Sequence, residues 1–184
     1  MKTKKLMLGG ALALLAGTLA LFWPARTHHP EAPLLASDLK LDSTRFPDLD
    51  HLETKYEMVD QDPYNPNAPG MVLQLRELGI SSSSAYEGWL KGPHPTDVEI
   101  RINVLVDARR ASQLLANRYS PQAHAMASRL SLGDESFNLK DRLVAIRVDR
   151  VHIELSVEHD GAGGTLMALA KAYTDLVTAK LGKH

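Results

Sequence analysis

Alternating polar residues near the carboxyl end of the chain carry the side chains best suited to chemistry. His152 and Glu154 lie two residues apart in an alternating segment, so both project from one face of a strand. In the hairpin register proposed below, Arg147 lies directly across from His152. With a carboxylate from a neighbouring strand, such as Glu99, this group could ligate a metal ion. Polar residues that face solvent on an open sheet give the same pattern, and we favour that interpretation.

Arginine gives this polar face a second role. Arg101 and Arg147 should project from it, and guanidinium groups recognise carboxylates and phosphates. Glu99 shares the face, so cross-strand ion pairs would neutralise part of the positive charge. These arginines could receive an anionic polymer or the acids of a partner, but ion-paired decoration is the interpretation that we favour for this exposed sheet face. Its residues are Glu99, Arg101, Asn103, Arg147, His152 and Glu154.

Two other motifs are incomplete. The run Gly161–Thr165 follows a strand and precedes a helix, where backbone N–H groups can hold an anion. It lacks the third glycine of a dinucleotide-binding loop and the lysine of a P-loop, so we interpret it as a flexible connection with Thr165 as the helix cap. Ser81–Ser84 is predicted to be a loop, because a serine run is usually a flexible connector. No Gly-x-Ser-x-Gly turn is present to expose one of these serines as a nucleophile. No catalytic residue, metal or cofactor is predicted.

Composition removes several classes of function. The chain of 184 residues contains no cysteine, which excludes thiol catalysis, disulfide bonds and cysteine zinc sites. The formal net charge of -1 lacks the positive field of a general nucleic-acid binder, so no nucleic-acid partner is predicted. The chain is 44% hydrophobic and 23% charged, which is typical of a globular protein.

A β-hairpin positions the arginine and the histidine. The alternating apolar runs 144–148 and 151–157 are offset by an odd step, so one continuous strand would turn its apolar face over halfway. A hairpin with Asp149 and Arg150 as its loop removes this conflict. It predicts the pairs Val148–Val151, Ile146–Ile153 and Val144–Leu155, with all six residues on one face.

The remaining periodic segments complete the domain. Residues 98–106 alternate as a strand, and a weaker alternation falls at Met71, Leu73 and Leu75. A helix follows the potential N-cap Asp107, and a second begins at Ser120-Pro121 and ends at Gly133. A last helix carries an apolar stripe from Leu166 to Leu181. We predict an α+β domain over 67–184, an antiparallel sheet of about four strands with helices on one face and water on the other.

The amino terminus predicts a membrane span. Three lysines in residues 1–5 precede Leu6–Trp23, which is 18 residues without a charge and about 27 Å long as a helix. Trp23 suits the interface of a retained signal-anchor, although cleavage after Ala20 as a signal peptide is the alternative. The lysines keep residues 1–5 in the cytoplasm. We expect a single-pass inner-membrane protein with its carboxyl-terminal domain in the periplasm or outside the cell.

Residues 24–66 are predicted to form a tether. Seven of the ten prolines lie between Pro24 and Pro69, and Glu31–Asp62 contains nine acids against three bases. Leu49, Leu52 and Tyr56 allow one short docked helix within it.

These features favour a non-catalytic, membrane-tethered module that binds another envelope protein or polymer through the polar sheet face. The bilayer, contacted through Leu6–Trp23, is the other expected partner. A small-ligand carrier or sensor that encloses its ligand between sheet and helices is one alternative. A metal-assisted hydrolase that uses His152 is another. The oligomeric state does not follow from the sequence.

Overall fold

The computed structural model describes residues 33–42, 44, 46–59, 75, 77–91, 95–159 and 162–182. The chain divides into two units, Met1–Pro33 and Leu34–His184. The proposed span Leu6–Trp23 lies outside the described residues. Among the helices formed by the described residues, none is both long and apolar enough to span a bilayer.

The second unit is an antiparallel sheet with helices. Its described elements, in chain order, are η1 (Ala36–Leu39), β1 (Leu49–Val59), β2 (Ile80–Leu90), β3 (Thr96–Leu105), α3 (Ala108–Arg118), α4 (Pro121–Met126), β4 (Ser128–Arg129), β5 (Glu135–Leu139), β6 (Leu143–Val148), β7 (Val151–Val157) and α5 (Gly163–Leu181).

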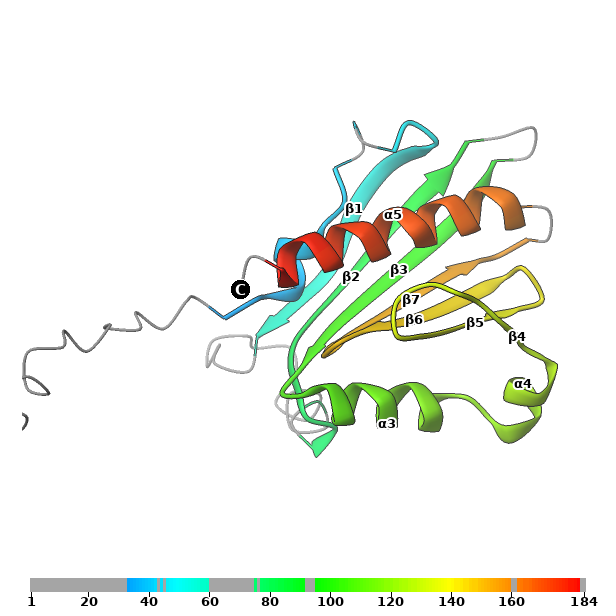
Figure 1. The fold of residues 1–184 in the computed structure, drawn as a ribbon. Helices are drawn as coiled ribbons and strands as arrows, with labels where there is room; N and C mark the ends of the chain where they lie inside the picture. The colour runs from blue at the N-terminus through cyan, green and yellow to red at the C-terminus, as the bar shows by residue number, and fades with distance from the viewer. Residues whose placement is uncertain are drawn as a thin grey trace, which may run out of the picture. The chain divides into compact units, whose positions relative to one another are not determined.

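The sheet has the spatial order β1-β2-β3-β7-β6-β5-β4 (Figure 1). Every neighbouring pair is antiparallel. Because β7 returns to pair with β3 at the centre, the chain must travel from β3 to the far edge at β4. The helices α3 and α4 make this connection. The predicted sheet of about four strands was therefore wrong, since the described residues form seven.

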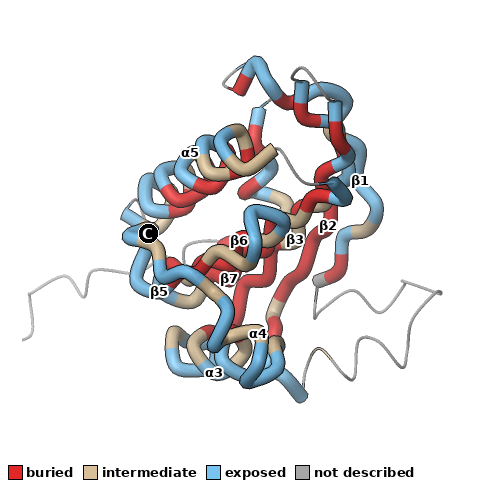
Figure 2. The backbone as a smooth tube through the Cα atoms, turned by 90° about the vertical axis from the view of Figure 1, so that its right-hand side faces the viewer, coloured by how far each residue is buried: buried red, intermediate tan, exposed pale blue. Residues whose placement is uncertain are grey.

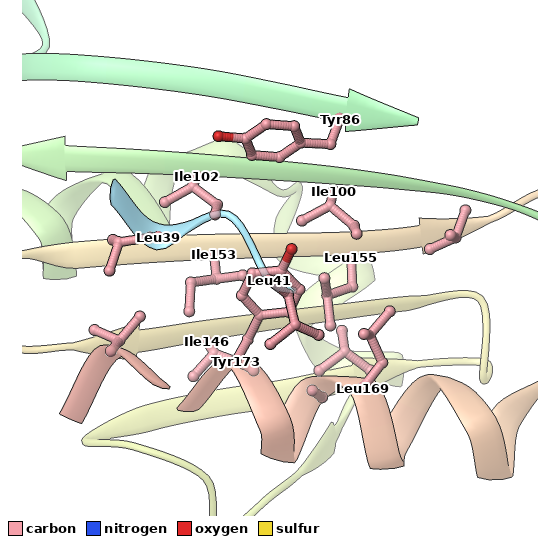
Figure 3. Close-up of a cluster of buried hydrophobic side chains, with 14 of the residues drawn as sticks. Leu39, Leu41, Tyr86, Ile100, Ile102, Ile146, Ile153, Leu155, Leu169 and Tyr173 are labelled. Carbon is pink, nitrogen blue, oxygen red and sulfur yellow. The ribbon is translucent and has the colours of Figure 1, made fainter. Parts of the chain in front are cut away.

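The apolar core lies on one face of the sheet, which we call the first face. Even-numbered residues of β3 and odd-numbered residues of β7 point to it, as expected for alternating strands. The stripe of α5 covers them, with Leu166, Leu169, Ala170, Tyr173 and Val177 fully buried. Figure 3 shows Tyr173 and Leu169 of α5 against Ile153 and Leu155 of β7, with Leu41 beside them.

Part of the opposite face, which we call the second face, is covered as well. Leu115 of α3 packs with Phe137 of β5 and Ala145 of β6, whose neighbours Val144 and Ile146 point into the core under α5. The helices α5 and α3 therefore lie on opposite sides of the sheet (Figure 2). The prediction of helices on one face only was wrong. The stripe of α3 is amphipathic, and such a stripe does not say which face of a sheet it covers.

The hairpin and its register are confirmed. The Cα partners are Val148–Val151, Ile146–Ile153 and Val144–Leu155. Asp149 adopts a φ of 51°, the left-handed conformation that aspartate tolerates better than most residues and that tight hairpin loops need.

Three segments differ from their predicted structure. Residues 34–59, assigned to a tether, belong to the folded unit, and Leu49–Val59 forms the edge strand β1 rather than a helix. Ser81–Ser84, predicted to be a loop, lies within β2. The helix begun at Pro121 ends at Met126 instead of continuing to Gly133. Of the weaker predicted strand, residues 71–74 lie outside the described residues.

Local capping chemistry explains where the two connecting helices begin. The carboxylate of Asp107 accepts a hydrogen bond from the Arg110 amide at 2.7 Å, as predicted for the N-cap of α3. The hydroxyl of Ser120 accepts from the Ala123 amide at 3.2 Å, and Pro121 occupies the first turn of α4. Thr165 does not cap α5, which starts two residues earlier at Gly163.

Candidate functional site

The structure places the six residues of the polar sheet face on the second face. Arg101 pairs with Glu154, and Asn103 pairs with His152. On the other side of β7, Arg147 pairs with His152. Directly paired residues project to the same side of an antiparallel sheet, and Glu99 precedes Arg101 by two positions.

Half of this face is covered, which corrects the expectation that it is exposed. His152 is 0% exposed, Asn103 4% and Glu154 9%. Glu99, Arg101 and Arg147 are partly exposed. Because α3 contacts β3, β6 and β7, a partner cannot reach the buried three while this helix stays in place.

Glu154 is the centre of a buried cluster of donors. Arg118 at the end of α3 donates from Nε to Oε2 at 2.5 Å and from Nη2 to Oε1 at 3.2 Å. The hydroxyl of Tyr119 donates to Oε2, and Arg101 donates from Nη1 to Oε1 at 3.4 Å. Two strands and the end of a helix therefore meet at a single carboxylate.

The protonation states fit a structural role for this cluster. Burial raises the pKa of Glu154, but the hydrogen bonds from Arg118 and Tyr119 outweigh it and hold the pKa below its usual value. Burial and the charge of Glu154 raise the pKa of Tyr119, so its hydroxyl remains a donor. A general acid needs a raised pKa and a free path to substrate. Glu154 has neither, and it acts as an anchor for α3.

A second polar chain ends at His152. Ser83 donates to Oδ1 of Asn103 at 2.7 Å, which turns the amide nitrogen of Asn103 toward Nδ1 of His152 at 3.4 Å. Nδ1 is then the acceptor, so the neutral ring carries its proton on Nε2. Nε2 is buried and has no hydrogen-bond partner among the described residues. Burial, reinforced by the positive charges of Arg118 and Arg101 and opposed by Glu154, lowers the pKa of His152 to about 4.

The arginines of the second face are occupied by acids of the chain itself. Arg101 Nη2 bonds Glu99 at 2.7 Å in addition to Glu154. Arg147 bonds Asp134 at 3.1 Å and Glu135 at 3.3 Å. These pairs use the guanidinium groups that were expected to receive a partner's acids.

Sequence reasoning missed three members of the cluster. Arg118 and Tyr119 bind Glu154 from the end of α3, and Ser83 begins the chain to His152. Arg118 does continue the helical spacing of 111–118, which was the one available signal. The serine run gave none, because residues 82–86 of β2 are buried on both faces and the serine hydroxyls act as internal donors and acceptors. Ser82, for example, accepts from the Ala36 amide at 2.9 Å on the first face.

The uncovered end of the second face carries an exposed aromatic residue. Trp89 of β2 is 54% exposed, and its register partners are Asp50 on β1 and Asp97 on β3. Glu87, two residues earlier, pairs with Glu53. We call the exposed residues of this region the Trp89 strip. It consists of Asp50, Glu53, Lys55, Glu87, Trp89 and Asp97.

A bulge in β1 builds the end of this strip. The register shifts between Asp50 and Glu53, and His51 adopts a φ of 50°. Its ring lies edge-on to Trp89, with centroids 6.3 Å apart and an interplanar angle of 82°. Gly88 permits the close approach of the β1 backbone at this bulge, since a Cβ at position 88 would lie 3.1 Å from the Asp50 carbonyl oxygen. Bulges redirect side chains, and here the bulge accompanies the contact between His51 and Trp89.

A surface hollow of about 540 Å³ adjoins the strip. It is lined by Lys40, Leu41 and Asp42 after η1 and by residues 50–53 of β1. Asp50 and Glu53 belong to both features, so the hollow extends the strip around the free edge of the sheet.

The described residues do not support the two other sites considered from the sequence, a metal site and a glycine-rich anion-binding loop. In the part of the chain that the structure describes, no group of three His, Asp or Glu side chains could hold a metal ion. Gly161 lies outside the described residues, and Gly163 and Gly164 form the first turn of α5.

Comparisons with known proteins give no relative. The chain matches no family model, no curated protein and no solved structure.

Proposed function

We propose that this protein is a membrane-tethered, envelope-facing, non-catalytic module that binds a partner bearing lysine or arginine on the Trp89 strip. The exposure of Trp89 carries this proposal. Tyr86 and Leu90, which point to the first face of the same strand, are 0% and 2% exposed, whereas Trp89 is 54% exposed although its strand is paired on both sides. Tryptophan is the residue type most often found at the energetic centre of protein interfaces.

The charge of the strip supports a cationic partner. Around Trp89 the strip holds four acids and Lys55, and the exposed Lys91, two residues after Trp89, adds a second lysine beside it. Lys55 bonds Glu87 at 3.1 Å, and Lys91 lies 3.8 Å from Asp50, while Glu53 and Asp97 make no ion pair with the described residues. A lysine or arginine side chain can stack on the indole ring and also meet these carboxylates.

The amino-terminal segment supports a tether. If Leu6–Trp23 spans the bilayer, the linker to the folded unit at Leu34 is residues 24–33. Ten residues reach at most about 35 Å when fully extended, so the module would work close to the membrane that anchors it. The lysines in 1–5 favour an orientation with the amino end in the cytoplasm, which places the module on the envelope side of the membrane.

The alternatives draw less support. A carrier would need space between sheet and helix, but Ile100, Ile153, Leu155 and Tyr173 fill that layer as parts of one packed cluster. A hydrolase that uses His152 would need access to a ring that is 0% exposed.

A peptide titration tests the proposal. The full chain in detergent micelles is titrated into a dye-labelled lysine-rich peptide and, separately, a glutamate-rich peptide of equal length, and anisotropy is recorded. We expect the lysine-rich peptide to bind at least tenfold more tightly than the glutamate-rich peptide. Its affinity should fall as the salt concentration rises. Trp89→Ala should weaken binding about tenfold. Val106→Ala, which changes a residue 59% exposed outside the strip, should leave it unchanged.

Equal binding of both peptides, or no effect of Trp89→Ala, would refute the docking surface. Protease accessibility in spheroplasts tests the tether separately. Digestion of the domain in spheroplasts supports export, and protection until lysis contradicts it.

A further inference from the structure

The helix α3 is held on the second face by few apolar and several polar contacts. Its buried residues are Ala111 and Leu115, whereas α5 buries six residues on the first face. Its polar contacts are those of Arg118 with Glu154 and of Ser112 with Glu135 at 3.1 Å, and Tyr119 adds a bond just after the helix. The core under α5 includes no residue of α3, so release of α3 would not by itself open that core.

Below α3, His152 is held in one hydrogen-bonded state. Its Nδ1 accepts from Asn103, whose orientation is fixed by Ser83. A proton added to Nδ1 would place two donors against each other. Either Asn103 must turn, which breaks its bond to Ser83, or the ring must move in a site where it is 0% exposed.

The charges around His152 do little to stabilise the protonated ring. Arg101 faces it from β3 and Arg118 from α3, and both oppose a positive ring. Arg147 lies across from it on β6 and is paired with Asp134 and Glu135. The charge of Glu154 favours a positive ring, but this carboxylate already accepts bonds from Arg101, Arg118 and Tyr119.

We propose that α3 is an acid-released cover: protonation of His152 detaches it from the sheet and exposes the polar face beneath. The released helix leaves Asn103, His152 and Glu154 open to solvent and to a partner, while the layer of sheet and α5 persists. This inference goes beyond binding at the Trp89 strip and does not depend on it.

The pH range follows from burial. The pKa of His152 is lowered to about 4 while the cover is closed, and a solvated histidine has a pKa near 6.5. Acidification from pH 6.5 toward 4 therefore favours the open state, in which the ring is hydrated.

Thiol labelling can observe this release, because the chain has no cysteine of its own. Ala145→Cys places a thiol under α3, and Ala170→Cys places one under α5. Both alanines are 0% exposed. The full chain in detergent micelles is labelled with a dithiodipyridine, which reacts at acidic pH, and rates are divided by those of a thiol in a short peptide. Between pH 7 and pH 4.5 we expect labelling at position 145 to rise at least tenfold while position 170 stays protected.

His152→Gln and His152→Leu, each combined with Ala145→Cys, should abolish the acid-induced rise. Should both combinations fail to fold, the profile with His152 intact decides alone. An unchanged rate at position 145, or equal rises at both positions, overturns the proposal. So does a full acid response in a folded protein that lacks His152.

Discussion

Tyr119, just after α3, donates a hydrogen bond to Glu154 on β7, across 35 residues of sequence. Between these two residues the chain forms α4 and the strands β4 to β6. The bond therefore connects the end of α3 with the central strand β7, which the chain reaches only after these elements. Together with Arg118, it fixes the end of α3 over the second face. The stability of that face therefore depends on a carboxylate rather than on a large apolar contact.

Replacement of Tyr119 by phenylalanine should lower the free energy of unfolding by about 1.5 kcal/mol, because a buried bond to a charged group is lost while Arg118 and Arg101 still satisfy Glu154. Urea unfolding at pH 7 measures the change. Tyr56→Phe is the matched control, since the Tyr56 side chain is only partly buried at the edge strand β1, and it should change stability by less than about 0.5 kcal/mol. A Tyr119 variant as stable as the control contradicts the anchor role.

Stability should fall as the pH drops from 6.5 to 4. The folded protein holds the pKa of His152 at about 4, whereas the unfolded chain takes up the proton near 6.5, so the unfolded state binds more protons in this window. The lowered pKa of Glu154 adds to the loss below its usual value of 4.5. The contribution of His152 is about 3 kcal/mol when fully developed.

Urea midpoints at pH 7 and pH 4.5 provide the measurement for this titration. His152→Gln should flatten the decline between these two values, and the loss that remains should come from carboxylates. His159→Gln is the matched control, because His159 is exposed and should leave the slope unchanged. If the wild-type slope survives in the His152 variant, the buried imidazole is not its source.

The hairpin could be predicted because it follows from the sequence separation of its apolar residues alone. Val148 and Val151 lie an odd number of residues apart, and only a reversal of the chain keeps both on one face. The caps at Asp107 and Ser120 were readable for a similar reason, since each acts within three residues of itself.

The extra strands could not be predicted, because their residues break the alternation. In β1, two register shifts and the positive φ of His51 interrupt the period of two. In β2, Ser82 and Ser83 are buried on opposite faces, so polar residues stand where a core strand would carry valine. Both patterns depend on neighbours that are distant in sequence.

The candidate site was half predictable. Alternation places Arg101, Asn103, His152 and Glu154 on one face, and the register agrees. Their burial depends on where α3 lies, and the amphipathic pattern of a helix carries no information about which face it covers. The hydrogen bonds that hold the end of α3 on Glu154, next to the buried His152, are what connect this cluster to the proposed control by pH.

Removal of the N-cap of α3 should lower the stability of the protein moderately. Asp107→Ala deletes the acceptor of the Arg110 amide and should lower the free energy of unfolding by about 1 kcal/mol. Asp107→Asn, which can still cap, should recover most of this. Thermal unfolding of the three proteins is the test. Equal losses in the alanine and asparagine variants would show that charge, and not capping, is what Asp107 supplies.

Two glycines should respond oppositely to alanine. Gly133 adopts a φ of +61°, and a Cβ there would overlap the carbonyl oxygen of Arg147 and lie 2.9 Å from Val148. That carbonyl accepts a bond from the Asp134 amide at 2.9 Å, so the backbone cannot retreat without loss. Gly133→Ala should therefore cost about 3 kcal/mol.

Gly164 lies in the first turn of α5, where an added methyl group would meet no atom within 4 Å, and Gly164→Ala should stabilise the protein by about 0.5 kcal/mol. Urea denaturation of both variants measures the contrast. A Gly133 variant that unfolds at the wild-type midpoint would mean that the turn before β5 relaxes freely, and that the path of Arg147 beneath it is not fixed by this close approach.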